Sequence, residues 1–206
     1  MNRRSMISLA ALAAVPAALA AGPLFAQESG ANANATAGGA MPMGEAEMKH
    51  MQDTMRVGGL ALLSSRVAQQ QASDPLVQAF AKWEVAEQQA IGDVLKSIGQ
   101  MGQGGQAMQV SGQLQPPSDD EIMAMLGDQE KQMLQQMQGL SGAEFDQAYM
   151  QAQLEGHQQL LQIQENYLQS GQNIHHVHVA KLARPTIVEH IEHLQGMTQT
   201  TSSTQQ

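Results

Sequence analysis

The sequence predicts an all-α fold, a four-helix bundle with a short extra helix in the long connection between its two halves. Good helix formers dominate the chain, including 15 Met, while aromatic residues make up only 3%. No segment shows the alternation of Val, Ile and Tyr that is typical of strands. Two long helical segments, a long connection and further helical segments follow one another, which is the helix order of such a bundle.

The first half of the bundle contains two predicted helices. One extends from about 45 to 71. Ser73–Pro75 ends it, because Asp74 can cap the next helix and Pro75 suits its first position. That second helix extends to about Ile98, and a Gly/Gln-rich loop over 99–117 with poor helix-forming capacity follows. Its apolar stripe is expected to comprise Leu76, Phe80, Trp83, Ile91, Val94 and Ile98.

The second half begins with two capping signals. Ser118 and Glu121 have the spacing of a capping box, which opens a helix that extends to about Gln138. Ser141 and Glu144 repeat the spacing and open a helix that ends at 171.

Asn173 can cap the last helix, which Pro185 breaks or kinks and which ends near Gly196. This connectivity indicates a ferritin-like four-helix bundle, with an up-down bundle of five helices as the alternative. The predicted regions are a signal peptide over 1–26, a disordered linker over 27–44, the helical bundle over 45–197 and a disordered tail over 198–206.

The N-terminal residues have the features of a secretory signal peptide. Arg3 and Arg4 form a basic start, and an Ala- and Leu-rich stretch follows over 6–21. Small residues offer three cleavage sites, at Ala20, Ala21 and Ala26. We therefore expect a periplasmic or secreted chain, with association with the cell envelope as an open alternative. The paired arginines leave both the general and the twin-arginine export routes open.

The composition excludes several function classes. A formal net charge of −9 argues against nucleic acid and anionic membrane surfaces as partners. No later stretch reaches the ~18 apolar residues of a membrane-spanning helix. The sequence contains no cysteine, so a hydrophobic core must hold the fold. It has no G-x-S-x-G, Walker or His-Glu-x-x-His motif, which favours a protein that is not an enzyme.

Four side chains are the candidate metal ligands: Glu84, Glu87, His157 and His190. Glu87 falls within the apolar stripe of the second helix, and Glu84 lies on its edge. A buried carboxylate is costly unless it is paired or bound to a metal, so Fe, Zn or Cu is the candidate cofactor. The alternative is structural: Glu87 pairs with Arg56 or reaches water, and His157 is a hydrogen-bonded core residue.

The remaining histidines of the C-terminal segment are expected at the surface. His175, His176 and His178 lie in the first turns after Asn173, and three ligands on a consecutive run cannot all converge on one ion from one helix. Glu189 and His193 have the spacing of a surface pair. No Glu-x-x-His motif occurs, which argues against a full di-iron oxidase.

Two further patterns suggest binding. Met41, Met43, Met48, His50 and Met51 offer the soft ligands that select Cu(I), although a Met-rich helix start is the alternative. Leu154, Leu161 and Leu168 recur every seven residues on a second side of their helix, which suggests self-association.

The run LSGAEFDQAY, Leu140–Tyr149, resembles a bacterial family of unknown function often labelled "predicted outer membrane protein" and placed among ferritin-like bundles. The resemblance covers about residues 48–197 and includes His157, Pro185–Thr186 with His190, and the segment 71–85. It implies a helical-bundle fold and an exported location, and no activity. In this chain Gln88 replaces a histidine frequent in the family, and an acidic residue of the family's first helix is absent.

These observations predict an exported, periplasmic helical-bundle protein without an assigned activity, a binding or envelope stress-related protein. The second hypothesis is a metal-binding bundle with a Glu/His site in its core. The third is a Met-rich copper binder.

Overall fold

The computed structural model describes residues 43–101 and 112–204, and in these residues the chain forms six helices and no strand. The helices are α1 Glu45–Gln71, α2 Pro75–Met101, α3 Asp119–Met125, α4 Asp128–Gln138, α5 Gly142–Ser170 and α6 Ile174–Thr204. The predicted all-α fold and helical bundle are confirmed. The signal peptide and most of the predicted linker lie outside the described residues.

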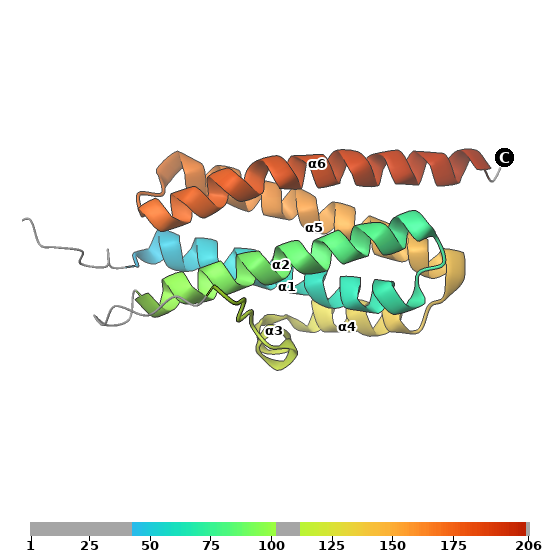
Figure 1. The fold of residues 1–206 in the computed structure, drawn as a ribbon, viewed down its shortest axis with the longest axis horizontal. Coiled ribbons are helices and arrows are strands. Elements are labelled where there is room, and N and C mark those ends of the chain that lie inside the picture. The colour runs from blue at the N-terminus through green and yellow to red at the C-terminus, as the bar shows by residue number, and fades with distance from the viewer. Residues whose placement is uncertain (1–42, 102–111, 205–206) are drawn as a thin grey trace, which may run out of the picture. The chain divides into compact units, whose positions relative to one another are not determined.

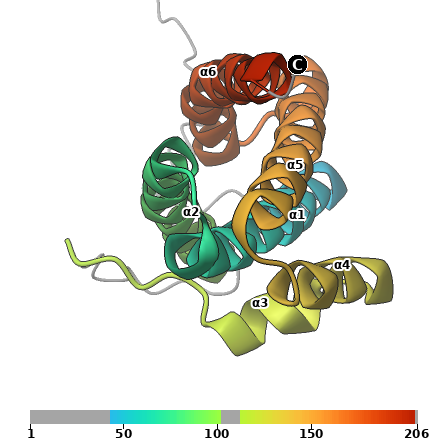
Figure 2. The same ribbon diagram turned by 90° about the vertical axis from the view of Figure 1, so that its right-hand side faces the viewer.

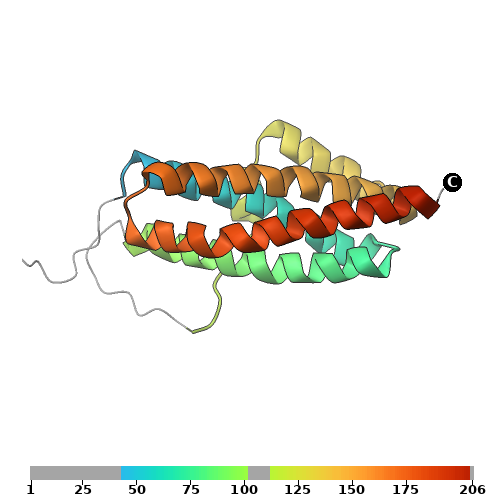
Figure 3. The same ribbon diagram turned by 90° about the horizontal axis from the view of Figure 1, so that it is seen from above.

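The four long helices α1, α2, α5 and α6 form the bundle (Figure 1). Seen end-on, α1, α2, α6 and α5 surround a common interior, while α3 and α4 lie outside it against α1 (Figure 2). The helices α1 and α2 pack against each other as one pair, and α5 and α6 pack side by side as the other (Figure 3). Short turns join the members of each pair, and the segment with α3 and α4 crosses between the pairs.

Side chains at the helix ends explain where the helices begin. Asp74 accepts a hydrogen bond from the Leu76 amide, at 2.8 Å, and so caps α2 as predicted. Ser118 and Glu121 form the predicted capping box at α3. On α5, the buried Asp146 accepts hydrogen bonds from the backbone amides of Ser73 and Asp74, which ties the α1–α2 turn to the other pair.

The crossover contains two helices, whereas the sequence predicted one that continued to Gln138. The helix breaks at Leu126, whose backbone is extended, and α4 restarts after Gly127. The buried Leu126 side chain packs into a cluster with Leu62 and Leu63 of α1. Extending the backbone at Leu126 therefore lets both short helices follow the surface of α1.

The last helix also differs from the prediction. Pro185 lies inside α6 without ending it, and the helix continues beyond Gly196 to Thr204. The helix therefore takes up most of the segment that was expected to be a disordered tail.

The buried face of α2 agrees only in part with the predicted stripe: Phe80 and Ile98 are buried as predicted, but other residues of the stripe are not. The side chains of Leu76, Trp83 and Val94 are exposed. The residues that α2 buries are Val77, Phe80, Ala81, Glu84, Gln88, Leu95, Ile98 and Gly99. Glu84 therefore points into the bundle, and Glu87 lies at the edge of the interior.

Charged residues of the crossover attach it to the bundle. Arg56 pairs with Glu130 of α4, Arg66 with Asp119 and Lys96 with Glu121. The alternative in which Arg56 neutralises Glu87 is therefore wrong, because Arg56 binds another partner.

The second leucine line of α5 is half-buried. Leu154 and Leu161 pack partly against core clusters of the bundle, and self-association through them and Leu168 stays a prediction. Among the helices of the described residues, none is long and apolar enough to span a membrane.

Candidate metal centre

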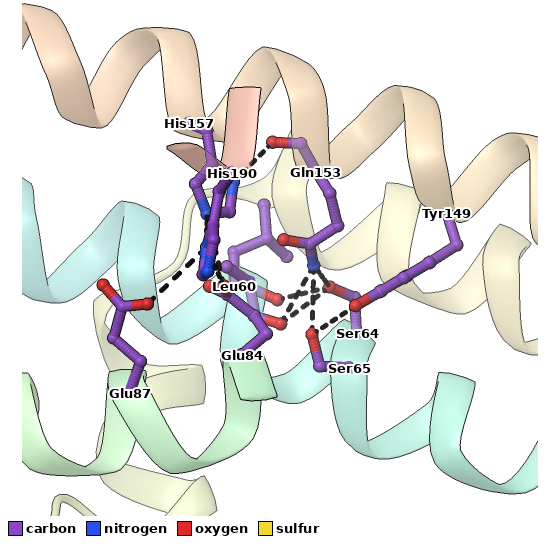
Figure 4. A network of polar contacts seen from close by, with 10 residues as sticks. Leu60, Ser64, Ser65, Glu84, Glu87, Tyr149, Gln153, His157 and His190 are labelled. Atoms are coloured by element: carbon purple, nitrogen blue, oxygen red, sulfur yellow. Dashed lines mark hydrogen bonds and ion pairs between the residues drawn. The ribbon is translucent and has the colours of Figure 1, made fainter. Parts of the chain in front are cut away.

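Three side chains from three helices meet in the middle of the bundle. His157 Nε2 of α5 lies 3.1 Å from His190 Nδ1 of α6. Glu84 Oε2 of α2 lies 3.2 Å from each of these two nitrogens. The three atoms form a nearly equilateral triangle, and their side chains point toward one another (Figure 4).

Burial makes this triangle energetically demanding. Glu84 and His157 are 0% exposed, and His190 is 9% exposed. Both imidazoles lie within 3.2 Å of Glu84 Oε2, but no hydrogen bond of favourable geometry reaches either oxygen of Glu84 from the described residues. A buried carboxylate without hydrogen bonds is among the costliest arrangements in a protein interior unless a cation compensates it.

The hydrogen bond on the other side of His157 determines its protonation. His157 Nδ1 lies 2.8 Å from the backbone carbonyl of Gln153, which can only accept, so Nδ1 carries a proton. In the neutral imidazole, Nε2 then presents its lone pair to Glu84 and His190. This is the pattern of metal-binding histidines, whose second nitrogen usually donates to a carbonyl or carboxylate.

The surrounding α1 and α5 residues hold Gln153 in place. Gln153 Nε2 lies 3.0 Å from Ser64 Oγ, 3.1 Å from the Ala61 carbonyl and 3.2 Å from Ser65 Oγ. Ser65 in turn shares a 2.7 Å hydrogen bond with Tyr149 (Figure 4). This buried network fixes the turn of α5 from which His157 projects.

The pKa directions follow from these contacts. Burial alone would raise the pKa of Glu84, but the charges of His157 and His190 outweigh it and lower the pKa to about 2. Burial lowers the pKa of His157, yet the neighbouring Glu84 carboxylate outweighs burial and the pKa is raised. The site therefore favours a carboxylate with positive charge beside it, whether that charge is a proton or a metal ion.

Glu87 lies at the solvent side of the triangle. Its Oε2 is 3.5 Å from His190 Nδ1, and its side chain is 18% exposed. Burial and the adjacent Glu84 charge raise the pKa of Glu87. Glu87 also lines a mostly apolar groove between α2 and α6 with a volume of about 390 Å³. Through Glu87 the cluster reaches the surface of the bundle.

The triangle has dimensions that suit a metal ion. Ligands ~2.0–2.1 Å from one ion, at tetrahedral or octahedral angles, stand about 2.9–3.4 Å apart. The three separations in the triangle, from 3.1 to 3.2 Å, fall in this range. Two imidazoles and one carboxylate are the ligands of non-haem Fe(II) sites and of catalytic Zn sites.

Comparison with known proteins assigns the chain to a family. A family model described as "Domain of unknown function (DUF4142)" matches residues 31–197. The chain belongs to this family. No curated protein and no solved structure matches the chain. The resemblance to a family of unknown function is thereby confirmed, whereas the ferritin-like relationship and the outer-membrane label stay untested.

In this DUF4142 chain the four predicted ligands have different surroundings. Glu84, His157 and His190 meet, and Glu87 is adjacent at the rim. His193 and Glu189 are exposed, as predicted. Gln88 is buried. A Cβ added at Gly58 of α1 would lie 2.3 Å from Oε1 of Gln88, so α1 and α2 approach closely at this point.

One other histidine was assigned wrongly from the sequence. His176 was expected at the surface and is 0% exposed. His50 of the Met-rich segment, whose burial was not predicted from the sequence, is 3% exposed. The signal that identifies His176 is its register, since the buried residues of α6 recur every three or four positions: His176, Ala180, Ala183, Ile187, His190, Leu194 and Met197.

Those residues of the Met-rich segment that the structure describes do not all lie on one face of α1. His50 points into the bundle, Met48 is exposed, and Met51 Sδ packs near Gly99 of α2. Met41 lies outside the described residues.

Proposed function

We propose that this DUF4142 protein binds a divalent transition-metal ion in the middle of its bundle, through Glu84, His157 and His190. One observation carries the proposal: a buried carboxylate without a hydrogen bond lies 3.2 Å from nitrogens of two histidines on different helices. Glu87 lies at the open side of the ligand triangle, where its carboxylate can supply a fourth ligand.

The donor set favours Fe(II) or Zn(II). Imidazole nitrogens and carboxylate oxygens suit both ions, whereas Cu(I) prefers thioether and thiolate sulfur. Bound there, either ion would act as a Lewis acid. The chain supplies the ligands, holds His157 through Gln153 and limits water to the Glu87 side. The function proposed is metal binding, and no catalytic step is assigned.

A buried ion pair is the competing function for the same residues. In that account, protons on the imidazoles neutralise Glu84, and the cluster only stabilises the fold. The two accounts differ in what they predict for bound metal, because an ion pair needs none.

The test is the amount of metal that the purified full chain retains. Metal-free protein is equilibrated with Zn(II), or anaerobically with Fe(II), desalted and assayed for metal per chain. Glu84→Gln and His157→Gln should each lose one equivalent relative to the unmodified chain, whereas Glu189→Gln, an exposed control on α6, should lose none. Retention of all metal by Glu84→Gln and His157→Gln would refute the proposal.

We also propose that the protein works in the periplasm as a metal-binding protein of the cell envelope. The basic start at Arg3 and Arg4 and the apolar stretch over 6–21 support export. The long crossover between the helix pairs supports a ferritin-like relationship. Cell fractionation should recover the shortened chain with periplasmic markers, and recovery of the full-length chain with cytoplasmic markers would contradict this location.

A further inference from the structure

A second histidine cluster lies at the end of the bundle where α1 and α6 begin. His50 Nδ1 of α1 is 2.9 Å from His176 Nδ1 of α6, across 126 residues of sequence. His50 stacks on Tyr167 of α5, with ring centroids 4.2 Å apart. Fourteen residues along α6 separate His176 from His190, which corresponds to about 21 Å, so this cluster is distinct from the Glu84 site.

The hydrogen bonds of the cluster determine its tautomers. Gln164 Nε2 donates to Thr54 Oγ1 at 3.1 Å, so the other atom of this amide, Oε1, is an acceptor. His50 Nε2 lies 2.7 Å from that oxygen and must carry a proton. Neutral His50 therefore has a lone pair at Nδ1, and the proton between the two imidazoles belongs to His176.

This assignment leaves one nitrogen bare. With its proton on Nδ1, His176 has a lone pair at Nε2, and this atom is buried without a hydrogen-bond partner among the described residues. A buried polar atom without a partner costs free energy, so native proteins rarely retain one without a role. The two imidazoles therefore have one basic nitrogen atom, His176 Nε2, that takes part in no hydrogen bond among the described residues.

A negative charge adjoins the two imidazoles. Glu47 of α1 is buried and accepts a 3.0 Å hydrogen bond from the Tyr167 hydroxyl. Although burial opposes ionisation, this hydrogen bond and others from the backbone lower the pKa of Glu47. An ionised carboxylate beside two neutral imidazoles favours a cation.

We propose that His50 and His176 bind a second divalent transition-metal ion through their Nδ1 atoms. Two nitrogens ~2.0–2.1 Å from one ion at about 90° stand about 2.9 Å apart, which matches the observed separation. The ion takes the place of the shared proton, which moves to the bare Nε2 of His176. The hydrogen bond from His50 Nε2–H to Gln164 orients the ligand, as partners of metal-binding histidines usually do.

A cavity adjoins His50, although His176 does not line it. It has a volume of about 280 Å³ and is lined by His50, Tyr167, Asp53 and other residues of α1 and α5. Because the protein supplies only two close ligands, we expect the ion to keep water ligands and to bind more weakly than at the Glu84 site.

The experiment is a Zn(II) titration of the metal-free full chain by equilibrium dialysis. The unmodified chain should bind two equivalents, and His176→Gln should bind one. His175→Gln, the exposed neighbour on the same helix, is the matched control and should bind two. Glu84→Gln should also fall to one, and the double variant Glu84→Gln, His176→Gln should bind none.

The outcomes separate this proposal from the one for the Glu84 site. If only Glu84→Gln loses an equivalent and His176→Gln binds as the unmodified chain does, the second site is refuted and the proposed function stands. If only His176→Gln loses an equivalent and Glu84→Gln binds as the unmodified chain does, the proposed function is refuted and the second site stands. Nitrogen NMR of the unmodified chain provides a check that needs no variant to fold: the His50 and His176 Nδ1 resonances should shift as the weaker equivalent binds. Unchanged resonances at saturation would overturn the proposal.

Discussion

At the scale of single residues, the shifted pKa values of Glu84 and His157 predict how the stability of the fold depends on pH. In the folded chain its pKa is about 2, below its ordinary value of 4.5. The folded state therefore binds this proton less readily than the unfolded state does. The pKa of His157 is shifted upward from 6.5, so the folded state holds that proton more readily. Opposite pH dependences are thus expected from two groups 3.2 Å apart.

The first prediction concerns metal-free protein in acid. The stabilisation from Glu84 is complete above about pH 4.5 and is lost as the pH falls toward 2, while that from His157 is lost as the pH rises through its folded pKa. Urea unfolding of Glu84→Gln between pH 2 and 5 should therefore show a shallower decline than the unmodified chain. Parallel declines would contradict the pairing of Glu84 with the histidines.

The second prediction concerns His176. Burial and the neighbouring His50 lower its pKa from 6.5 to about 4, so the unfolded state binds this proton first. In the metal-free protein, stability should fall as the pH drops from about 6.5 to 4, and His176→Gln should flatten this interval. Chemical unfolding of both proteins measures the effect. His175→Gln is the control, and a flattening of the same size in that variant would contradict the assignment.

A few contacts between helices depend on a single residue. Asp146 of α5 accepts hydrogen bonds from the backbone amides of Ser73 and Asp74 and from the Ser73 hydroxyl. These bonds join the α1–α2 turn to α5. Gly59 of α1 makes room for α3, because a Cβ there would lie 2.6 Å from Ile122 Cγ2.

Asp146→Ala should destabilise the bundle. It leaves the two backbone donors without their acceptor, and a loss of about 1–3 kcal/mol in the free energy of unfolding is expected, since water reaches part of this turn. Denaturant unfolding measures it, with Gln147→Ala, the exposed neighbour on α5, as control. Equal stability of the two variants would show that Asp146 does not hold the turn.

Gly59→Ala should lower the melting temperature, although Ala is favoured over Gly in a helix by ~1 kcal/mol. The added methyl group must displace the branched Ile122 side chain and with it α3. Gly196→Ala on α6 is the matched control, because a Cβ there meets nothing within 4 Å, and it should raise the melting temperature. A higher melting temperature for Gly59→Ala would show that α3 does not pack tightly on α1.

The error for α2 shows why the sequence predicts the helix better than its buried face. The stripe with Leu76, Trp83 and Val94 contains more large apolar residues than the face that is buried. Because the middle of this bundle is polar, with Glu84 and Gln88 contributed by α2, hydrophobicity marks the interior poorly. The first residues of α2, α3, α5 and α6 depend on local capping and turn signals and were predictable, while the break at Leu126, the end of α6 and the buried face of α2 were not.

At the scale of the whole molecule, the bundle carries buried polar groups at two levels. The middle level holds Glu84, His157 and His190, which the sequence identified because they stand within or beside apolar patterns. The end level holds His50 and His176, and the sequence missed their pairing because the contact joins the first and last helices of the bundle. Only the assembled fold brings these residues together.

The most direct test of the central claim is X-ray absorption at the zinc edge, measured on His176→Gln loaded with one equivalent of Zn(II). This variant lacks the second histidine pair, so the spectrum reports the Glu84 site. The account predicts only nitrogen and oxygen ligands at about 2.0–2.1 Å, with the multiple scattering of two imidazoles. A sulfur ligand at about 2.3 Å, or a first shell without imidazole, would place the ion elsewhere and contradict the metal centre proposed for this bundle.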